Sequence, residues 1–309
     1  MAAGQEIFLG TQEATKDQLN DILAACPNYG RFGSGRDGGE AGESSAIFWK
    51  SSRLRIDNAN SGDIWLSNTP SVPSRFGGSY NRVATYVRLV DKQSNAAFSV
   101  YNIHNYMPAE SDYRLQAVKL LAKTMANRAN PKEPVFLTGD FNSPEADAVT
   151  QWMKSGTDNP IRFRDSYRDF DPSGSVTTGF GTKFDYIYYP DESKYRTVRS
   201  YVANTPVASD HSPIVADVIA TETSSIIAKQ AREVPTPMVR IEASMLTIEL
   251  APSSRIDRIE VVDLKGRVET SSSGRQPRHR LDVSSLPGGT HILRLLSEGG
   301  YSAQPIVLP

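Results

Sequence analysis

The sequence predicts an α/β domain followed by a small all-β domain, and three observations lead to this prediction. Over residues 1–220, short β-like runs alternate with stretches of helical periodicity. Residues 221–237 have no clear strand period and end in Val-Pro-Thr-Pro, which is typical of a linker. Beyond them only short β runs and Gly/Pro turns remain, so we expect an antiparallel β-sandwich over residues 238–309.

The first domain begins with an apolar run and a capped helix. Ile7–Gly10 is short and apolar, as in a buried strand. Thr15 precedes helical spacing and Gln18 follows three residues later, which is the pattern of a capping box. Further strands are expected at 46–49, 83–87, 98–101, 135–137, 184–188 and 215–219, with a helix over 112–127. Strands alternating with helices favour the α/β class.

The second domain contains four apolar runs, at 245–250, 256–264, 281–283 and 291–296. Lys265-Gly266 and Pro287-Gly288-Gly289 supply turns between them. This spacing favours strands joined by short connections.

Composition excludes several classes of site. The 34 Lys and Arg residues nearly balance the 35 Asp and Glu residues, so no overall basic field indicates a nucleic-acid partner, although a local basic groove stays open. Cys26 is the only cysteine, which excludes an intrachain disulfide and a cysteine metal cluster. No run approaches the ~18 apolar residues that a membrane-spanning helix needs.

Five polar segments of the first domain end apolar runs or lie within them. They are Gln12-Glu13, Asn102-Ile103-His104, Gly139-Asp140-Phe141-Asn142, Asp185, and Ser209-Asp210-His211-Ser212. A single carboxylate in such a place is usually a helix cap or a turn residue. Here, however, the only two histidines of the first domain both stand in these segments. Because strand ends at one edge of a sheet converge, the conjunction predicts one catalytic site.

The residue types suit the hydrolysis of phosphate esters. That reaction needs a hard cation held by oxygen ligands, a polarised water, donors to the phosphoryl oxygens and an acid near the leaving oxygen. The segments supply these groups as Glu13, His104, Asp140, Asn142, Asp185, Asp210 and His211.

The order of the motifs carries a family resemblance. Gln-Glu, Asn-x-His, Gly-Asp-Phe-Asn, Phe-Asp-Tyr-Ile and Ser-Asp-His follow one another over residues 12–211, an order that resembles the DNase I-like endonuclease/exonuclease/phosphatase superfamily. The segments 35–38, 40–43, 65–70 and 82–85 are similar to its bacterial branch. The resemblance implies a four-layer α/β sandwich and an enzyme that hydrolyses phosphate esters with Mg²⁺ or Mn²⁺.

The resemblance also implies roles for the acidic residues and for one histidine. Glu13 resembles the metal-binding glutamate, and Asp210 resembles a further metal-binding or water-orienting ligand. His211 resembles the catalytic histidine, oriented by Asp185. A carboxylate that accepts from one ring nitrogen fixes the tautomer and supports the cationic form. Asp140 is expected to orient or deprotonate the attacking water.

The remaining implied roles concern contacts with the substrate. Asn142 is expected to donate to a phosphate oxygen. His104 resembles the second catalytic histidine, with Glu43 as its expected partner. Arg82 and Asn102 are expected to contact the substrate.

Two features depart from the family pattern. Members of the family begin with a strand that ends in a metal-binding asparagine, whereas this chain starts close to the glutamate strand. Met1–Gly10 also lacks the basic and apolar regions of a signal peptide, so we expect the reading frame to be truncated at its start. In addition, Asn105 and Tyr106 follow His104 where the branch often has His-x-Asp, which predicts altered substrate contacts.

The second domain resembles the C-terminal sorting domain of type IX secretion substrates. The resemblance lies in residues 261–267, which end in Lys-Gly-Arg, in the Leu-Asp-Val-Ser-Ser-Leu-Pro-Gly-Gly turn at 281–289, and in the strand at 291–295. It implies export through outer-membrane secretion machinery to the medium or the cell surface. An accessory sandwich that binds surfaces or glycans is the alternative.

Within the implied class, hydrolysis of phosphodiesters by an extracellular nuclease is the first expectation, with nucleic acid as the substrate. It rests on analogy, because a secreted hydrolase suits scavenging. Sphingomyelinase-like activity and sugar or inositol phosphatase activity are the alternatives within the class. A non-catalytic surface protein that keeps the fold is the alternative outside it.

Overall fold

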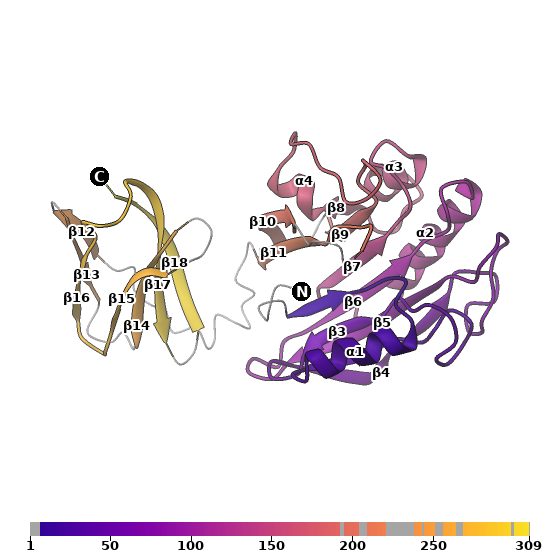
Figure 1. The fold of residues 1–309 in the computed structure, drawn as a ribbon, viewed down its shortest axis with the longest axis horizontal. Helices are drawn as coiled ribbons and strands as arrows, with labels where there is room; N and C mark the ends of the chain where they lie inside the picture. The colour runs from indigo at the N-terminus through magenta and orange to yellow at the C-terminus, as the bar shows by residue number, and fades with distance from the viewer. Residues whose placement is uncertain are drawn as a thin grey trace. The chain divides into compact units, whose positions relative to one another are not determined.

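The structure is a computed structural model that describes residues 7–191, 195–203, 209–220, 238–242, 244–250, 256–263, 268–297 and 300–308. The chain forms two compact units, Met1–Glu222 and Thr223–Pro309 (Figure 1). The linker predicted over residues 221–237 lies outside the described residues. Within the described ranges, no helix has both the length and the apolar character that a membrane crossing requires.

A six-stranded sheet forms the centre of the first unit. Its order is β4-β5-β6-β7-β9-β8, and only β6 and β7 run parallel to each other. Parallel neighbours require a crossover connection, which helix α2 supplies. The strands are β4 (Leu54–Trp65), β5 (Val83–Asp91), β6 (Ala97–His104), β7 (Val135–Asp140), β8 (Phe163–Asp165) and β9 (Asp185–Pro190), and α2 is Ser111–Ala126.

Two smaller sheets accompany the central sheet. Strand β3 (Ile47–Lys50) lies between β1 (Phe8–Gly10) and β2 (Tyr29–Phe32), and β10 (Tyr195–Val202) pairs with β11 (Ile214–Ala220). The ring of Phe8 on β1 lies 5.7 Å from that of Phe136 on β7, centroid to centroid. Tyr195 on β10 lies 6.2 Å from the same ring. Both small sheets therefore pack against the central sheet near β7.

Helices cover the outer faces of this arrangement. Helix α1 (Lys16–Ala25) buries Leu19 against Phe48 of β3, and its predicted capping box is confirmed by a 2.8 Å bond from Thr15 N to Gln18 Oε1. Helices α2 and α3 (Ala148–Ser155) bury an apolar cluster against the other face of the central sheet. A short helix, α4 (Ser166–Phe170), follows β8. The predicted four-layer α/β sandwich is confirmed.

The second unit consists of two antiparallel sheets around one apolar core. In β13 every second residue is buried, as expected for a strand with one face on a core. The turn predicted at Lys265-Gly266 lies outside the described residues. One sheet contains β12 (Met238–Glu242), β13 (Met245–Glu249) and β16 (Arg278–Asp282), and the other contains β14 (Arg258–Val262), β15 (Val268–Ser273), β17 (Gly289–Ser297) and β18 (Gly300–Leu308).

Candidate active site

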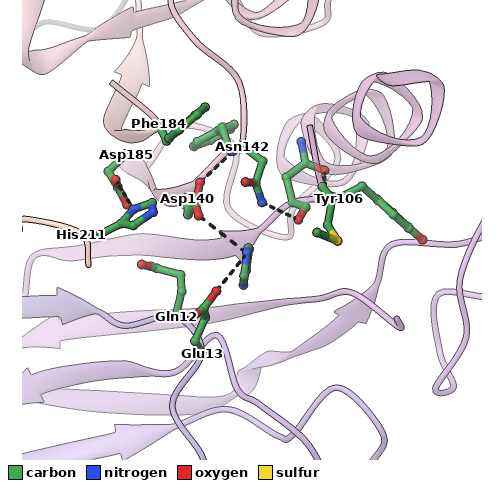
Figure 2. A network of polar contacts seen from close by, with 12 residues as sticks. Gln12, Glu13, Tyr106, Asp140, Asn142, Phe184, Asp185 and His211 are labelled. Atoms are coloured by element: carbon green, nitrogen blue, oxygen red, sulfur yellow. Dashed lines mark hydrogen bonds and ion pairs between the residues drawn. The ribbon is translucent and has the colours of Figure 1, made fainter. Parts of the chain in front are cut away.

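Three adjacent strands bring the predicted catalytic residues to one edge of the central sheet. His104 ends β6 and is in register with Asp140, which ends the parallel strand β7. Asp140 is in register with Asp185, which begins the antiparallel strand β9. A strand that ends and an antiparallel neighbour that begins share one edge, so segments far apart in the sequence converge there (Figure 2).

The turn after β7 needs its glycine and its asparagine. A Cβ on Gly139 would lie 2.0 Å from the carbonyl oxygen of Ile103, and the φ of Gly139 is 146°, so another residue would be strained there. Asn142 has a φ of 50°, a left-handed conformation that asparagine tolerates better than most residues. Its backbone N–H donates to Asp140 Oδ1 at 2.7 Å. The turn therefore fixes the carboxylate and places the Asn142 amide beside it.

His211 forms a dyad with Asp185. Its Nδ1 lies 2.8 Å from Asp185 Oδ2, so the carboxylate accepts the ring proton and leaves Nε2 for other contacts. This hydrogen bond raises the pKa of His211 to about 9, against the opposing effect of partial burial. Asp140 and the exposed Asp210 add smaller raising effects on that pKa. At neutral pH the imidazole is therefore cationic.

Asp140 differs from His211, because its charged form is hard to solvate. Burial, followed by the negative charge of Asp185, raises the pKa of Asp140 to about 7. The backbone N–H of Asn142 and the His211 cation oppose this rise. The carboxyl group therefore titrates near neutrality, where a general base is most effective.

His104 stays neutral. Burial, followed by the charges of Arg82 and Arg36, holds its pKa well below the usual value. Its Nε2 lies 3.6 Å from Asp140 Oδ2 and 3.8 Å from Glu13 Oε1, beyond hydrogen-bonding distance. The imidazole thus lies near two carboxylates without a hydrogen bond to either.

A small pocket adjoins His104, and a buried arginine lines it. Arg82 is only 5 % exposed, yet its buried Nε has no hydrogen-bond partner and its guanidinium forms no ion pair among the described residues. Burial lowers the pKa of Arg82, but an arginine guanidinium keeps its proton in proteins, so the side chain remains a cation. The lining residues are Glu13, Arg36, Glu43, Ser44, Ser45, Asn81, Arg82, Val83 and His104.

Glu43 corrects one prediction. It lines this pocket, but its carboxylate forms an ion pair with Arg36 rather than with His104. The bond joins Glu43 Oε2 to Arg36 Nη1, and the backbone N–H of Arg36 donates to the Glu43 carbonyl at 2.8 Å. These two bonds hold Arg36 to Glu43. Because His104 is neutral, it does not require an acidic partner.

Asn102 corrects a second prediction. It is fully buried, and both amide hydrogens are used, by the carbonyl oxygens of Thr11 at 2.8 Å and Ala46 at 3.0 Å. Its Oδ1 accepts from Gln12 Nε2 at 2.7 Å and from Thr138 Oγ1 at 3.0 Å. All of its hydrogen-bonding capacity is satisfied, so Asn102 ties the two sheets together and is not available to a substrate.

The acidic cluster fits a divalent cation. Ligand atoms of Asp140, Asp185 and His211 all lie within 4.8 Å of one another. Because Asp185 and His211 already bond each other, the oxygens of this cluster that remain for a hard cation are those of Asp140, whose pKa is also raised by the charge of Glu13. Glu13 and Asp210, the two residues predicted as metal ligands, are exposed and are not part of this three-residue cluster. A cation would relieve the repulsion between the carboxylates.

Sequence patterns missed three residues that lie next to the dyad. The Thr178 hydroxyl accepts the backbone N–H groups of Phe184 and Asp185, at 3.0 and 3.1 Å. Gly179 packs so closely that a Cβ there would lie 2.8 Å from two ring atoms of His211. Phe180 places its ring 5.6 Å from that of His211, edge to face. The only signal for them was the Thr-Thr-Gly-Phe-Gly run before the β9 motif.

Comparisons with known proteins identify the family to which the first unit belongs. Residues 3–211 match the Endonuclease/Exonuclease/phosphatase family. No curated protein sequence matches the chain closely enough to count as a relative.

Solved structures show the same fold. An endonuclease/exonuclease/phosphatase from Bacteroides vulgatus is 25% identical, with a TM-score of 0.62 over 69% of this chain and 84% of that one. A mannosyl-6-phosphatase from Bacteroides thetaiotaomicron is 26% identical, with a TM-score of 0.58 over 69% of this chain and 85% of that one. The family match covers more than half of the chain and includes every strand that carries the site. The chain therefore belongs to the endonuclease/exonuclease/phosphatase family and is a hydrolase that acts on phosphate ester bonds.

Proposed function

We propose that this chain hydrolyses phosphate esters by attack of water, with a divalent cation held at Glu13 and Asp140. The observation that carries the proposal is the buried guanidinium of Arg82 in the pocket beside His104, because its Nε has no hydrogen-bond partner among the described residues. A buried cation without a partner costs free energy, and an oxyanion of the substrate would remove that cost. An acidic cluster beside an anion-binding arginine matches what a phosphate group and its metal ion require.

Each residue around the site has a defined task in this proposal. Asp140, one of the two carboxylates that hold the cation, orients the attacking water, because a bound cation lowers the pKa of this carboxyl group below its metal-free value of about 7 and keeps it ionised. The His211 cation, held by Asp185, donates from Nε2 to the phosphoryl group. The Asn142 amide carries two N–H donors, of which one makes a 3.3 Å contact with Asn105 O and the other can reach a phosphate oxygen.

The cation and the neutral histidine complete the site. When bound, a divalent cation such as Mg²⁺ or Mn²⁺ neutralises charge on the phosphoryl oxygens and polarises water. Because the pKa of His104 is well below the usual value, its imidazole stays uncharged, so it adds a hydrogen bond without repelling the cation.

The nature of the ester is the finer part of the proposal. The buried cation of Arg82 beside His104 favours the higher negative charge of a terminal phosphate, and the similarity to a Bacteroides mannosyl-6-phosphatase supports a sugar phosphate monoester. The nuclease-like expectation requires a basic groove that follows a nucleic-acid backbone, and the near-zero net charge gives it no general support. We therefore place monoesters first and phosphodiesters second.

A panel of substrates tests both levels of the proposal. Mannose 6-phosphate, plasmid DNA, RNA, sphingomyelin and bis(4-nitrophenyl) phosphate would each be incubated with Mg²⁺, with Mn²⁺ and with a chelator. We expect metal-dependent turnover, fastest on the monoester. Faster turnover of DNA or RNA would reverse the order of the two ester classes, and equal rates with and without the chelator would contradict the role of the cation.

We also propose that the second unit directs export through outer-membrane secretion machinery, so that the enzyme acts outside the cell. The Leu-Asp-Val-Ser-Ser-Leu-Pro-Gly-Gly turn and the two-sheet core support this proposal. Full-length and 1–222 forms, each given an export signal, would be expressed in a bacterium with type IX secretion. We expect only the full-length form outside the cell, and equal release of both would favour an accessory binding domain.

A further inference from the structure

The loop before β9 folds back on itself beside the catalytic histidine. Gly179 and Thr182 bond each other in both directions, with N···O distances of 3.1 and 2.9 Å, and Phe180 and Gly181 lie between them. The loop is also joined to the His211 segment, because the backbone N–H of Ser212 donates to the carbonyl of Thr178. Phe180 is thus held at the tip of a tight turn that is anchored next to the dyad.

Neither the turn nor the protein core accounts for a phenylalanine at this tip. Phe180 and Gly181 both have positive φ, 48° and 76°. Such two-residue turns favour Asn-Gly or Gly-Gly, because a bulky side chain is strained in the left-handed region. The Phe180 side chain is also 75% exposed, so its burial contributes little stability. Backbone strain and an exposed aromatic ring at a catalytic site together indicate a functional role.

The ring stands at the border of the reaction centre. Its centroid lies 5.6 Å from that of His211, with the ring planes at 76°. Phe184 stacks on the same imidazole at 6.2 Å and 23°, so His211 has aromatic neighbours on two sides. Phe184 is partly buried, whereas most of the Phe180 surface remains open to solvent. An open aromatic surface next to the catalytic imidazole is available to the organic group of a bound ester.

We propose that Phe180 forms a stacking subsite for a ring in the alcohol portion of the substrate. Resting on the proposed phosphoesterase function, it names the substrate class as phosphate esters of alcohols that contain a ring. A flat apolar ring binds the face of a sugar or of a nucleobase, and both gain from contact with an aromatic side chain. Acyclic phosphate esters lack such a face, so Phe180 contributes to specificity for rings.

The test compares a ring ester with an acyclic ester of the same phosphate group. Release of phosphate from mannose 6-phosphate, adenosine 5′-monophosphate and glycerol 3-phosphate gives two ring-to-acyclic ratios of kcat/KM. We expect Phe180→Asn, which suits positive φ and removes the ring, to lower at least one ratio about tenfold, and Phe180→Trp to restore it. The sugar and nucleotide arms show which ring the subsite accepts.

Phe170→Asn is the matched control, because Phe170 is another exposed phenylalanine, on α4, and its loss should leave both ratios unchanged. Unchanged ratios in Phe180→Asn, or an equal loss on all three esters, would overturn the subsite. Dissociation constants of the same three esters, measured by calorimetry with the full chain, give the same ratios without turnover. If Phe180 favours the binding of ring esters but the protein hydrolyses none of the three esters, the proposed function is contradicted and the stacking subsite is not.

Discussion

Asp185→Asn tests the electrostatic design of the site, because it removes one charge and keeps the shape of the side chain. The 2.8 Å bond to Asp185 is the largest cause that raises the pKa of His211 to about 9. Without the carboxylate, we expect the pKa to return towards the usual 6.5. At pH 8 the cationic fraction would then fall from about 90% to about 3%, roughly a 30-fold loss. If the cation donates to the phosphoryl group, kcat should fall by at least that factor.

Histidine NMR measures the pKa directly, because the chain contains only four histidines. The titration would use metal-free wild type and Asp185→Asn, alongside pH–rate profiles of both with Mg²⁺. In the wild type we expect activity to decline above about pH 9 as the His211 cation is lost, and this limb to move to lower pH in the variant. A His211 pKa unchanged by the substitution, or a loss of kcat below threefold at pH 8, would show that the Asp185 carboxylate does not set the charge of His211.

Stability provides a further check with a defined sign. A folded-state pKa raised above the unfolded value stabilises the protein fully below pH 6.5, and this stabilisation disappears as pH rises through about 9. Denaturant unfolding should therefore show Asp185→Asn less stable by on the order of 2 kcal/mol at pH 6, with a difference that shrinks towards pH 10. A difference that grows with pH would show that another group is responsible.

Three further substitutions give separate expectations. Arg82→Met should lower kcat/KM about 100-fold, because the substrate phosphate loses a cation that binds it. Thermal stability should not fall, because the substitution removes a buried charge whose Nε has no hydrogen-bond partner. A lower Tm with full activity would show that Arg82 stabilises the fold and does not act on the substrate. Gly179→Ala should lower kcat at least tenfold, since its Cβ would meet the His211 ring at 2.8 Å, and unaltered kinetics would contradict that packing. Lys183→Met should reduce the free energy of unfolding in urea by about 3–5 kcal/mol, because it leaves the buried Asp165 carboxylate, 3.0 Å from Lys183 Nζ, without its ion-pair partner. Adding Asp165→Asn should recover most of this loss of stability.

The catalytic edge was predictable because its motifs are local. Asp140 and Asn142 belong to one turn, Asp185 begins β9, and His211 lies shortly before β11. The sequence pattern therefore located the residues, and the strand register explains why they meet.

Partners chosen by tertiary packing were not predictable in the same way. Asn102 lies on the same strand face as His104, since side chains two residues apart share a face. It sits two residues farther from the edge, however, where Thr11 and Ala46 cover it. The strand face predicted for Asn102 was correct, but its position farther from the edge of the sheet gives it a structural role and not a substrate-binding one.

The longest missed strand shows a similar limit. Strand β4 contains the polar run Asp57–Gly62, which has the composition of a loop. The strand nevertheless continues through this run, with a shift of its register against β5 between Asp57 and Gly62. Asp57 accepts a hydrogen bond from Arg88 of β5 at 2.8 Å, which holds the irregular segment to the sheet. An irregular ladder anchored by a cross-strand ion pair leaves no alternation for a sequence pattern to detect.

Metal dependence and the role of the dyad are tested together by turnover of the preferred ester by wild type and by His211→Ala, during titration of the chelated protein with Mg²⁺ or Mn²⁺. We expect activity to be absent after chelation, to return in the wild type as the cation is added, and to stay at least 100-fold lower in His211→Ala at saturating cation. Full activity of the chelated wild type, or of the metal-loaded variant, would contradict a metal-dependent phosphoesterase centred on the Asp185–His211 dyad.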